Sequence, residues 1–262
     1  MSTAPRSRHR IGQRTISALG VVLLAATLLS SAVHGRPDSS ARLFAFLAAE
    51  EIETASFADE RGPPLFGMQT EPLLGGEVVE KWTRAKAEII RDLDAVARCR
   101  AHDVCSPAAQ KLIDLSSNGE GRSGRAKLGL INRAVDLAIS PADDQTQWGV
   151  ADHWSAPFET LNSNRGDCED YAIVKYLALR AAGISQDDVK IIILRNVFPE
   201  DDHAAVAARV DGEWLILDNR ILTLVRDTDI VRATPRFVLD HQGARRFVWA
   251  RKTRRSARIP ST

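Results

Sequence analysis

The pattern of apolar positions divides the chain into a helical first half and a strand-rich second half. From Val78 to Cys99 the apolar residues recur mostly at steps of three and four, which predicts an amphipathic helix. Ser106 and Pro107 predict the start of a second helix that runs to about Leu115, because proline is favoured in a first turn. A third helix is predicted over residues 126–139. Its expected inward-facing residues are Leu128, Ile131, Val135 and Leu137.

Residues 168–182 are apolar on nearly every side, with charges only at the start and at Lys175 and Arg180. Such a helix is buried, and Gly183 is a typical residue to end it. We therefore expect a central helix whose first residue, Cys168, meets the surface at a cleft. The preceding residues 148–165 are expected to form a long connection.

The second half has the pattern of β-strands. Residues 189–194 form a β-branched run, and residues 204–210 and 213–217 flank Asp211-Gly212, a strong signal for a hairpin turn. Residues 221–225 and 246–250 are candidate edge strands. Helices followed by an antiparallel sheet predict an α+β fold.

The N-terminal residues 1–34 have the features of a signal peptide. A basic segment precedes an apolar run, Ile16–Leu29, and small residues follow it. The run is shorter than the roughly 18–20 residues of a spanning helix, so export is preferred over the alternative, an uncleaved membrane anchor. We expect residues 35–76 to be an N-terminal extension with one amphipathic helix over 41–57. Residues 77–250 are expected to form one domain, and residues 251–262 a basic tail.

The charge balance excludes one class of protein. The chain has 35 Lys and Arg against 34 Asp and Glu, a formal net charge of +1. This balance argues against a general nucleic-acid-binding protein, which carries a strongly basic surface.

The three cysteines have different expected roles. Cys99 and Cys105 lie close in sequence, and in an oxidising compartment we expect them to pair. The alternative is a metal site with His102. Cys168 is then the odd cysteine, which suggests a reactive thiol, with a buried structural thiol as the alternative.

The predicted hairpin brings His203 and Asp218 together. A two-residue turn pairs Val210 with Glu213, so Asp218 lies opposite Ala205, and His203 shares the face of Ala205 as a diagonal neighbour of Asp218. A helix N-terminus favours a thiolate at Cys168 and offers N–H groups to an oxyanion. Cysteine, histidine and aspartate in this layout predict a cysteine hydrolase or acyltransferase.

Three acidic residues, Asp167, Glu169 and Asp170, surround this thiol. Their charges oppose a thiolate. Either they cap the helix, or their oxygens hold a hard cation such as Ca²⁺, which would reverse the local field.

The sequence resembles the bacterial transglutaminase-like cysteine proteinases, whose best-known members are the periplasmic LapG-type proteases. The resemblance covers residues from about 65 to 218. The matching motifs are Asp152-x-Trp154-x-x-Pro157-x-Glu159, Gly166-Asp167-Cys168-Glu169-Asp170-Tyr171-Ala172, His203-Ala204 and Leu217-Asp218-Asn219-Arg220.

The resemblance implies a papain/transglutaminase-like fold, with a helical N-terminal layer and a buried cysteine-bearing helix against an antiparallel sheet. It implies a catalytic triad of Cys168, His203 and Asp218, and a calcium site with Asp167 and Glu169 as ligands and Asp170 as a further one. It also implies a periplasmic endopeptidase that cleaves a protein substrate, a large surface adhesin in LapG-type enzymes, and is sequestered by an inner-membrane cyclic-di-GMP receptor. The alternatives are acyl transfer by the same triad and an inactive, calcium-stabilised binding module.

Overall fold

The computed structural model describes residues 62–102 and 105–249, all within the compact unit Ala58–Thr262. The predicted signal peptide, the predicted helix over 41–57 and the predicted tail from residue 251 lie outside the described residues. None of the described helices is long and apolar enough to cross a membrane.

The three helices predicted in the first half are present as α2, α3 and α4, and they form a layer. The α-helices are α2 (Glu77–His102), α3 (Pro107–Ser117), α4 (Gly124–Ala138), α5 (Asp144–Trp148), α6 (Pro157–Ser163) and α7 (Cys168–Ala181). Ser106 caps α3 as its sequence suggested, because its hydroxyl accepts from the Ala109 N–H at 3.2 Å. Leu137 was expected to face inward, but it is 70 % exposed, since it lies off the Leu128–Ile131–Val135 face of α4.

The strands form one large sheet and one short pair. The strands are β1 (Gln69–Pro72), β2 (Ser140–Pro141), β3 (Arg165–Gly166), β4 (Val189–Asn196), β5 (Asp202–Val210), β6 (Glu213–Leu217), β7 (Val225–Arg226), β8 (Ala233–Asp240) and β9 (Gly243–Val248). The large sheet has the order β1-β9-β8-β4-β5-β6-β7, and its pairs are antiparallel. The short pair, β2 with β3, is parallel.

The sheet differs from the prediction at its edges. The strand expected over 221–225 is reduced to the two residues of β7, and the one expected over 246–250 lies at Gly243–Val248. Strand β8 was not predicted, because Pro235 and Arg236 interrupt its apolar pattern. Strand β1 pairs with β9, so the sheet includes residues before the domain start expected at residue 77.

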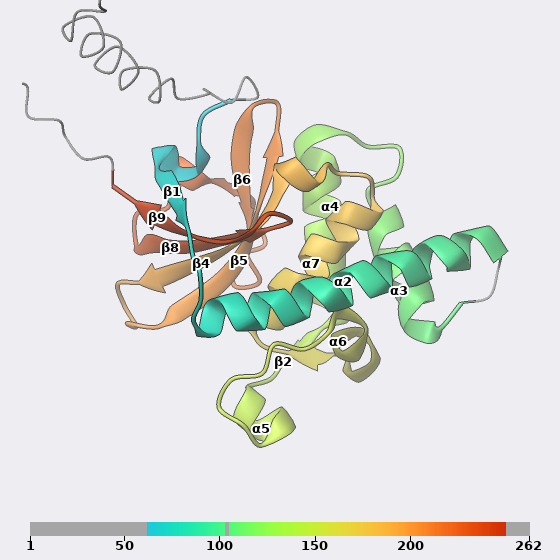
Figure 1. Cartoon of the computed structure of the whole chain (residues 1–262). Helices are drawn as coiled ribbons and strands as arrows, with labels where there is room; N and C mark the ends of the chain where they lie inside the picture. Colours follow the sequence, from blue (N-terminus) through green and yellow to red (C-terminus); the bar gives the residue numbers. More distant parts are fainter. Residues whose placement is uncertain (1–61, 103–104, 250–262) are drawn as a thin grey trace, which may run out of the picture. The chain divides into compact units, whose positions relative to one another are not determined.

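Helix α7 lies between the helical layer and the sheet (Figure 1). It contacts α2, α3, α4 and α6, and it also contacts β4 and β5. Ten of its residues are buried, from Asp170 to Leu179, as the apolar pattern on all its sides predicted. The structure therefore confirms the α+β fold with a central cysteine-bearing helix.

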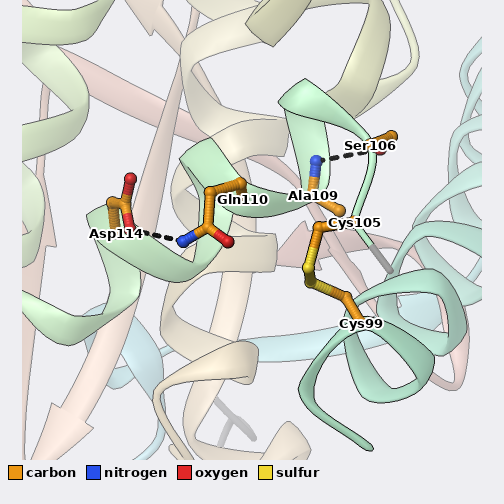
Figure 2. The surroundings of a disulfide bond; sticks show 6 residues. All are labelled: Cys99, Cys105, Ser106, Ala109, Gln110 and Asp114. Carbon is orange, nitrogen blue, oxygen red and sulfur yellow. Dashed lines mark hydrogen bonds between the residues drawn. A yellow bond between two sulfur atoms is a disulfide. The ribbon is translucent and has the colours of Figure 1, made fainter. Parts of the chain in front are cut away.

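A disulfide bond joins Cys99, near the end of α2, to Cys105, which precedes α3 (Figure 2). This is the predicted pairing, and it leaves Cys168 as the free cysteine of the described chain.

Candidate active site

Cys168 is the first residue of α7. The side chain of the N-cap residue, Asp167, accepts a hydrogen bond from the Glu169 N–H at 3.2 Å. The thiol itself is half-buried and donates to Glu169 Oε2 at 2.9 Å. Burial raises the pKa of the Cys168 thiol, and the negative charge of Glu169 raises it further. The thiol therefore needs a proton acceptor and a positive field to become a nucleophile.

The hairpin β5–β6 has the predicted register. Val210 pairs with Glu213, and the ladder continues to Val206 and Leu217. Both turn residues have positive φ, 52° at Asp211 and 79° at Gly212, which matches the type I′ turn that Asp-Gly favours.

The hairpin places the imidazole of His203 against the carboxylate of Asp218. The distance from His203 Nε2 to Asp218 Oδ1 is 2.9 Å, and His203 is 2 % exposed. An ionised carboxylate only accepts, so Nε2 carries the hydrogen. Burial raises the pKa of the Asp218 carboxyl, but the hydrogen bond and charge of His203 outweigh burial and hold it below its ordinary value.

The other ring nitrogen, His203 Nδ1, is buried and has no hydrogen-bond partner among the described residues. The thiol lies beside the same strand, since the N–H of Ala204, the next residue, is 3.5 Å from Cys168 Sγ. The structure thus joins His203 to Asp218 directly and brings Cys168 to their strand, while the thiol donates to Glu169 rather than to His203.

A group of three carboxylates lies beside the start of α7. Oxygens of Asp144, Asp167 and Asp170 lie within 4.8 Å of one another. Burial raises the pKa of Asp167 to about 8, and the charges of Glu169, Asp170 and Asp144 add to it. Burial likewise raises the pKa of Asp170 to about 7. These carboxylates repel one another when ionised, and a bound cation would relieve that repulsion.

Parallel pairing of β2 with β3 brings Asp144 to this group. Ser140 pairs with Arg165 and Pro141 with Gly166, so the residues before α5 lie beside those before α7. Ser155 then holds Asp170, by its N–H at 2.8 Å and its hydroxyl at 3.2 Å. A Cβ on Gly166 would lie 2.5 Å from Asp170 Oδ2, so this close approach requires glycine.

Asp144 and Ser155 were not predicted as site residues. Asp143-Asp144 after a proline is a signal for a helix start, and Asp143 does cap α5 through the Thr146 N–H at 2.9 Å. That signal gives no reason to place Asp144 near Cys168, which depends on the two-residue strand pair. The predicted ligand Glu169 lies outside the three-carboxylate group, since its carboxylate accepts from the thiol.

A cleft of about 420 Å³ opens at the thiol. It is lined by residues from the segment before α5, the start of α7 and the loop after Asp218: Pro141, Ala142, Asp143, Gly166, Asp167, Cys168, Asn219 and Arg220. Cys168 is therefore accessible from a cleft, as a nucleophile requires.

Residues 96–252 match the sequence profile of the family described as bacterial transglutaminase-like cysteine proteinase. No curated protein matches the chain significantly.

Three solved structures with a similar chain path are forms of LapG from Legionella pneumophila. One is 19 % identical with a TM-score of 0.47 and covers 60 % of this chain and 86 % of its own. The calcium-bound form is 20 % identical with a TM-score of 0.48, covering 58 % and 86 %. The EGTA-treated form is 19 % identical with a TM-score of 0.45, covering 57 % and 80 %. The family match carries the assignment, because these likenesses are distant.

Proposed function

Because the chain belongs to the bacterial transglutaminase-like cysteine proteinase family, we propose that it is an exported, calcium-dependent endopeptidase with the triad Cys168, His203 and Asp218. Family membership makes the protein a cysteine peptidase. The triad, the calcium and the substrate are the further content of the proposal.

The observation that carries the triad is the state of the His203 ring. Its Nε2 is fixed by Asp218 at 2.9 Å, and its Nδ1 is buried without a hydrogen-bond partner in the described part of the chain. A buried nitrogen without a partner is unfavourable unless a partner arrives. The Cys168 thiol is the partner that the reaction would use, since it lies 3.5 Å from the N–H of Ala204, the residue after His203.

In the proposed reaction, His203 Nδ1 accepts the thiol proton and Cys168 Sγ attacks the carbonyl carbon of a peptide bond. The N–H of Cys168 at the start of α7, which has no partner inside the helix, stabilises the oxyanion. The imidazolium then protonates the departing amine, leaving a thioester on Cys168. Water then attacks the thioester while His203 accepts its proton as general base. The carboxylic acid product leaves, and His203 returns the proton to Cys168, which restores the free thiol.

Asp218 has an orienting role in this scheme. It accepts from His203 Nε2–H and stabilises the imidazolium that forms when Nδ1 takes the thiol proton. Its own orientation is fixed from the backbone, because the Arg220 N–H donates to the same Oδ1 at 2.8 Å.

The three-carboxylate group fits a calcium ion by its chemistry. Ca²⁺ prefers carboxylate oxygens, and Asp144, Asp167 and Asp170 offer three within 4.8 Å of one another. When bound, the ion would supply a positive charge that favours the Cys168 thiolate. Glu169 would then be the carboxylate that contacts the thiol rather than a ligand of this group.

The location and partners follow from the family and the predicted signal peptide. Residues 1–34 support export to the periplasm, and an endopeptidase there acts on exported proteins. A large surface adhesin as substrate, and an inner-membrane cyclic-di-GMP receptor as regulator, are the partners that the family resemblance supports.

The test is cleavage of exported proteins from the cell that makes this enzyme. The mature protein is incubated with them in calcium and in EGTA, beside the Cys168→Ser variant, and new termini are mapped by mass spectrometry. We expect cuts that need both Cys168 and calcium. New amide cross-links in place of new termini would instead indicate acyl transfer, and no change in any protein would indicate a binding module.

A further inference from the structure

A lysine of α7 and an aspartate of α4 form an ion pair in the interior of the domain. The distance from Lys175 Nζ to Asp136 Oδ1 is 2.7 Å, and their side chains are 1 % and 5 % exposed. Lysine is almost never fully buried, and a buried ion pair is often no more stabilising than apolar side chains of similar volume. Stability alone therefore does not account for it.

The position of the pair relates it to the thiol and the hairpin. Lys175 lies seven residues after Cys168 on α7, two helical turns and about 10 Å along the same face. Tyr171 lies between them on this face, with its ring centroid 5.9 Å from Lys175 Nζ. Asp136 comes from α4, which packs against α7, β5 and β6.

The pair also interacts electrostatically with Asp218, which follows β6. Burial raises the pKa of the Asp218 carboxyl, and the positive charge of Lys175 acts with His203 against it. Burial raises the pKa of Asp136; Lys175 lowers it, and the charge of Asp218 raises it again. Burial lowers the pKa of Lys175, while Asp136 and then Asp218 favour its charged form. The charge of Lys175 thus acts on two carboxylates: its ion-pair partner on α4, and Asp218 at the end of β6, the strand on which α4 packs.

We infer that Lys175 and Asp136 are positioning residues for the triad. Asp136 holds the Lys175 ammonium in place, and the ammonium adds to His203 and the Arg220 N–H in favouring the ionised Asp218 that accepts from His203 Nε2. With Nε2–H fixed in this way, His203 presents its bare Nδ1 to Cys168. The inference rests on the proposed triad. It adds Lys175 to that triad as a buried positive charge that favours the ionised form of Asp218.

A double variant separates this role from a structural one. Lys175→Met or Asp136→Leu alone leaves one buried charge without its partner and is expected to destabilise the fold. Lys175→Met/Asp136→Leu removes both charges at similar volume, and its melting temperature is expected to stay within a few degrees of the wild type. Lys190→Met/Asp240→Asn is the matched control, because it removes both charges of a second pair, 2.5 Å apart between β4 and β8, and neither residue lines the cleft.

Two measurements read the site without needing a substrate. One is the ¹⁵N shifts of the His203 ring, which report its tautomer; the other is the alkylation rate of Cys168 by iodoacetamide at neutral pH. In the Lys175→Met/Asp136→Leu variant we expect mixed tautomers and at least tenfold slower alkylation, while Lys190→Met/Asp240→Asn changes neither. A folded double variant with the wild-type tautomer and alkylation rate would show that the pair is only structural.

His203→Ala is the reference that tests the triad itself. If it alkylates as fast as the wild type, His203 does not activate Cys168, and the proposed triad fails. If it alkylates more slowly but the double variant does not, the triad stands and the inference about Lys175 and Asp136 is wrong.

Discussion

At the scale of single residues, the site combines a thiol among carboxylates with an imidazole that is fixed on one side only. Cys168 donates to Glu169, and His203 Nε2 is held by Asp218. In the proposed mechanism, activation of the thiol requires its proton to move from Glu169 Oε2 to His203 Nδ1. The energetic problem of the site is to make that transfer favourable.

Loss of either reacting group should remove activity without loss of fold. Cys168→Ala should abolish cleavage, and His203→Ala should lower kcat about 100- to 10,000-fold, the usual contribution of a general acid–base. Asp218→Ala should be milder, because an orienting residue contributes less than the groups that react. Turnover and circular dichroism measure both effects.

His241→Ala is the control for this series. His241 also faces an aspartate, Asp187, at 3.5 Å, but it lies in the turn between β8 and β9 and does not line the cleft. It should keep near wild-type turnover. Near wild-type turnover in His203→Ala, as in His241→Ala, would show that His203 has no part in the mechanism.

Asp92 on α2 should make stability depend on pH. It accepts from the Phe158 N–H of α6 at 3.0 Å, and burial raises its pKa from an ordinary 3.8 to about 6. Between these values the folded state binds more protons than the unfolded state. The free energy of unfolding should therefore fall as pH rises from about 4 to about 6, by up to about 3 kcal/mol, and level off above it.

Asp92→Asn keeps the acceptor for Phe158 N–H and removes the titration. Urea denaturation of both proteins at several pH values separates the contribution of Asp92 to the unfolding free energy from that of Asp167 and Asp170, whose pKa values are also raised. A difference between the two proteins that does not change with pH would contradict the expected titration.

At the scale of elements, the disulfide ties the end of α2 to the start of α3. The closed loop between Cys99 and Cys105 is short, so its chain-entropy contribution is about 2 kcal/mol. Cys99→Ala/Cys105→Ala should lose about that much unfolding free energy in guanidinium denaturation and keep its activity, because neither residue lines the cleft.

The oxidation state of the cysteines can be checked directly. Non-reducing peptide mapping of exported protein should find Cys99 joined to Cys105 and Cys168 free. Cys168→Ser serves as the stability control, since it removes a thiol but no bridge. A bridge that includes Cys168, or equal stability with and without the Cys99–Cys105 bond, would contradict the expectation.

Elements with strong local signals could be predicted from the sequence, and elements fixed by distant pairing could not. The hairpin followed from Asp211-Gly212, and α7 followed from its apolar pattern. Helix α6 was missed because Pro157 and Glu159 set a short helix inside an expected connection, where no long period exists to detect. The strand pair β2–β3 has only two residues on each side, too few for any pattern.

The same distinction holds for the site. The placement of Cys168 at a helix start and of His203 beside Asp218 was predictable, because a local helix signal and a short-range hairpin set these positions. Asp144 was not, because it reaches Asp167 only through the β2–β3 pair. In the sequence, Lys175 is only a rare charge in an apolar helix. Its pairing with Asp136 could not be predicted, because it depends on how α4 packs on α7.

At the scale of the whole molecule, calcium should couple stability to activity. A ligand that binds only the folded state stabilises it by about 2.7 kcal/mol at 100 times its Kd. We expect calcium to raise the melting temperature and EGTA to remove activity, with Mg²⁺ a poor substitute because it demands a smaller, stricter shell. Scanning calorimetry and turnover follow both effects.

Single variants decide which carboxylates bind. Asp144→Asn and Asp167→Asn should lose the calcium-induced rise in melting temperature. Glu169→Gln should keep it if the ligands are the three grouped carboxylates, and its loss would add Glu169 to the shell. A wild-type protein whose melting temperature and turnover ignore both calcium and EGTA would leave the acids as helix caps.

Strand β1 pairs with β9, so Gln69, near the start of the described residues, lies opposite Val248, near their end. Ribosomes and export channels deliver a polypeptide from its N-terminus, so β1 emerges long before the strand it pairs with. The β1–β9 pair is the contact of the sheet with the largest separation in sequence. Such contacts form slowly, because the ends of a long loop must come together first. The adjacency also makes residues 62–249 a candidate for circular permutation: in a protein limited to these residues, a short linker across the two ends, with new termini opened at Asp211-Gly212, should preserve the sheet while changing the order in which it assembles.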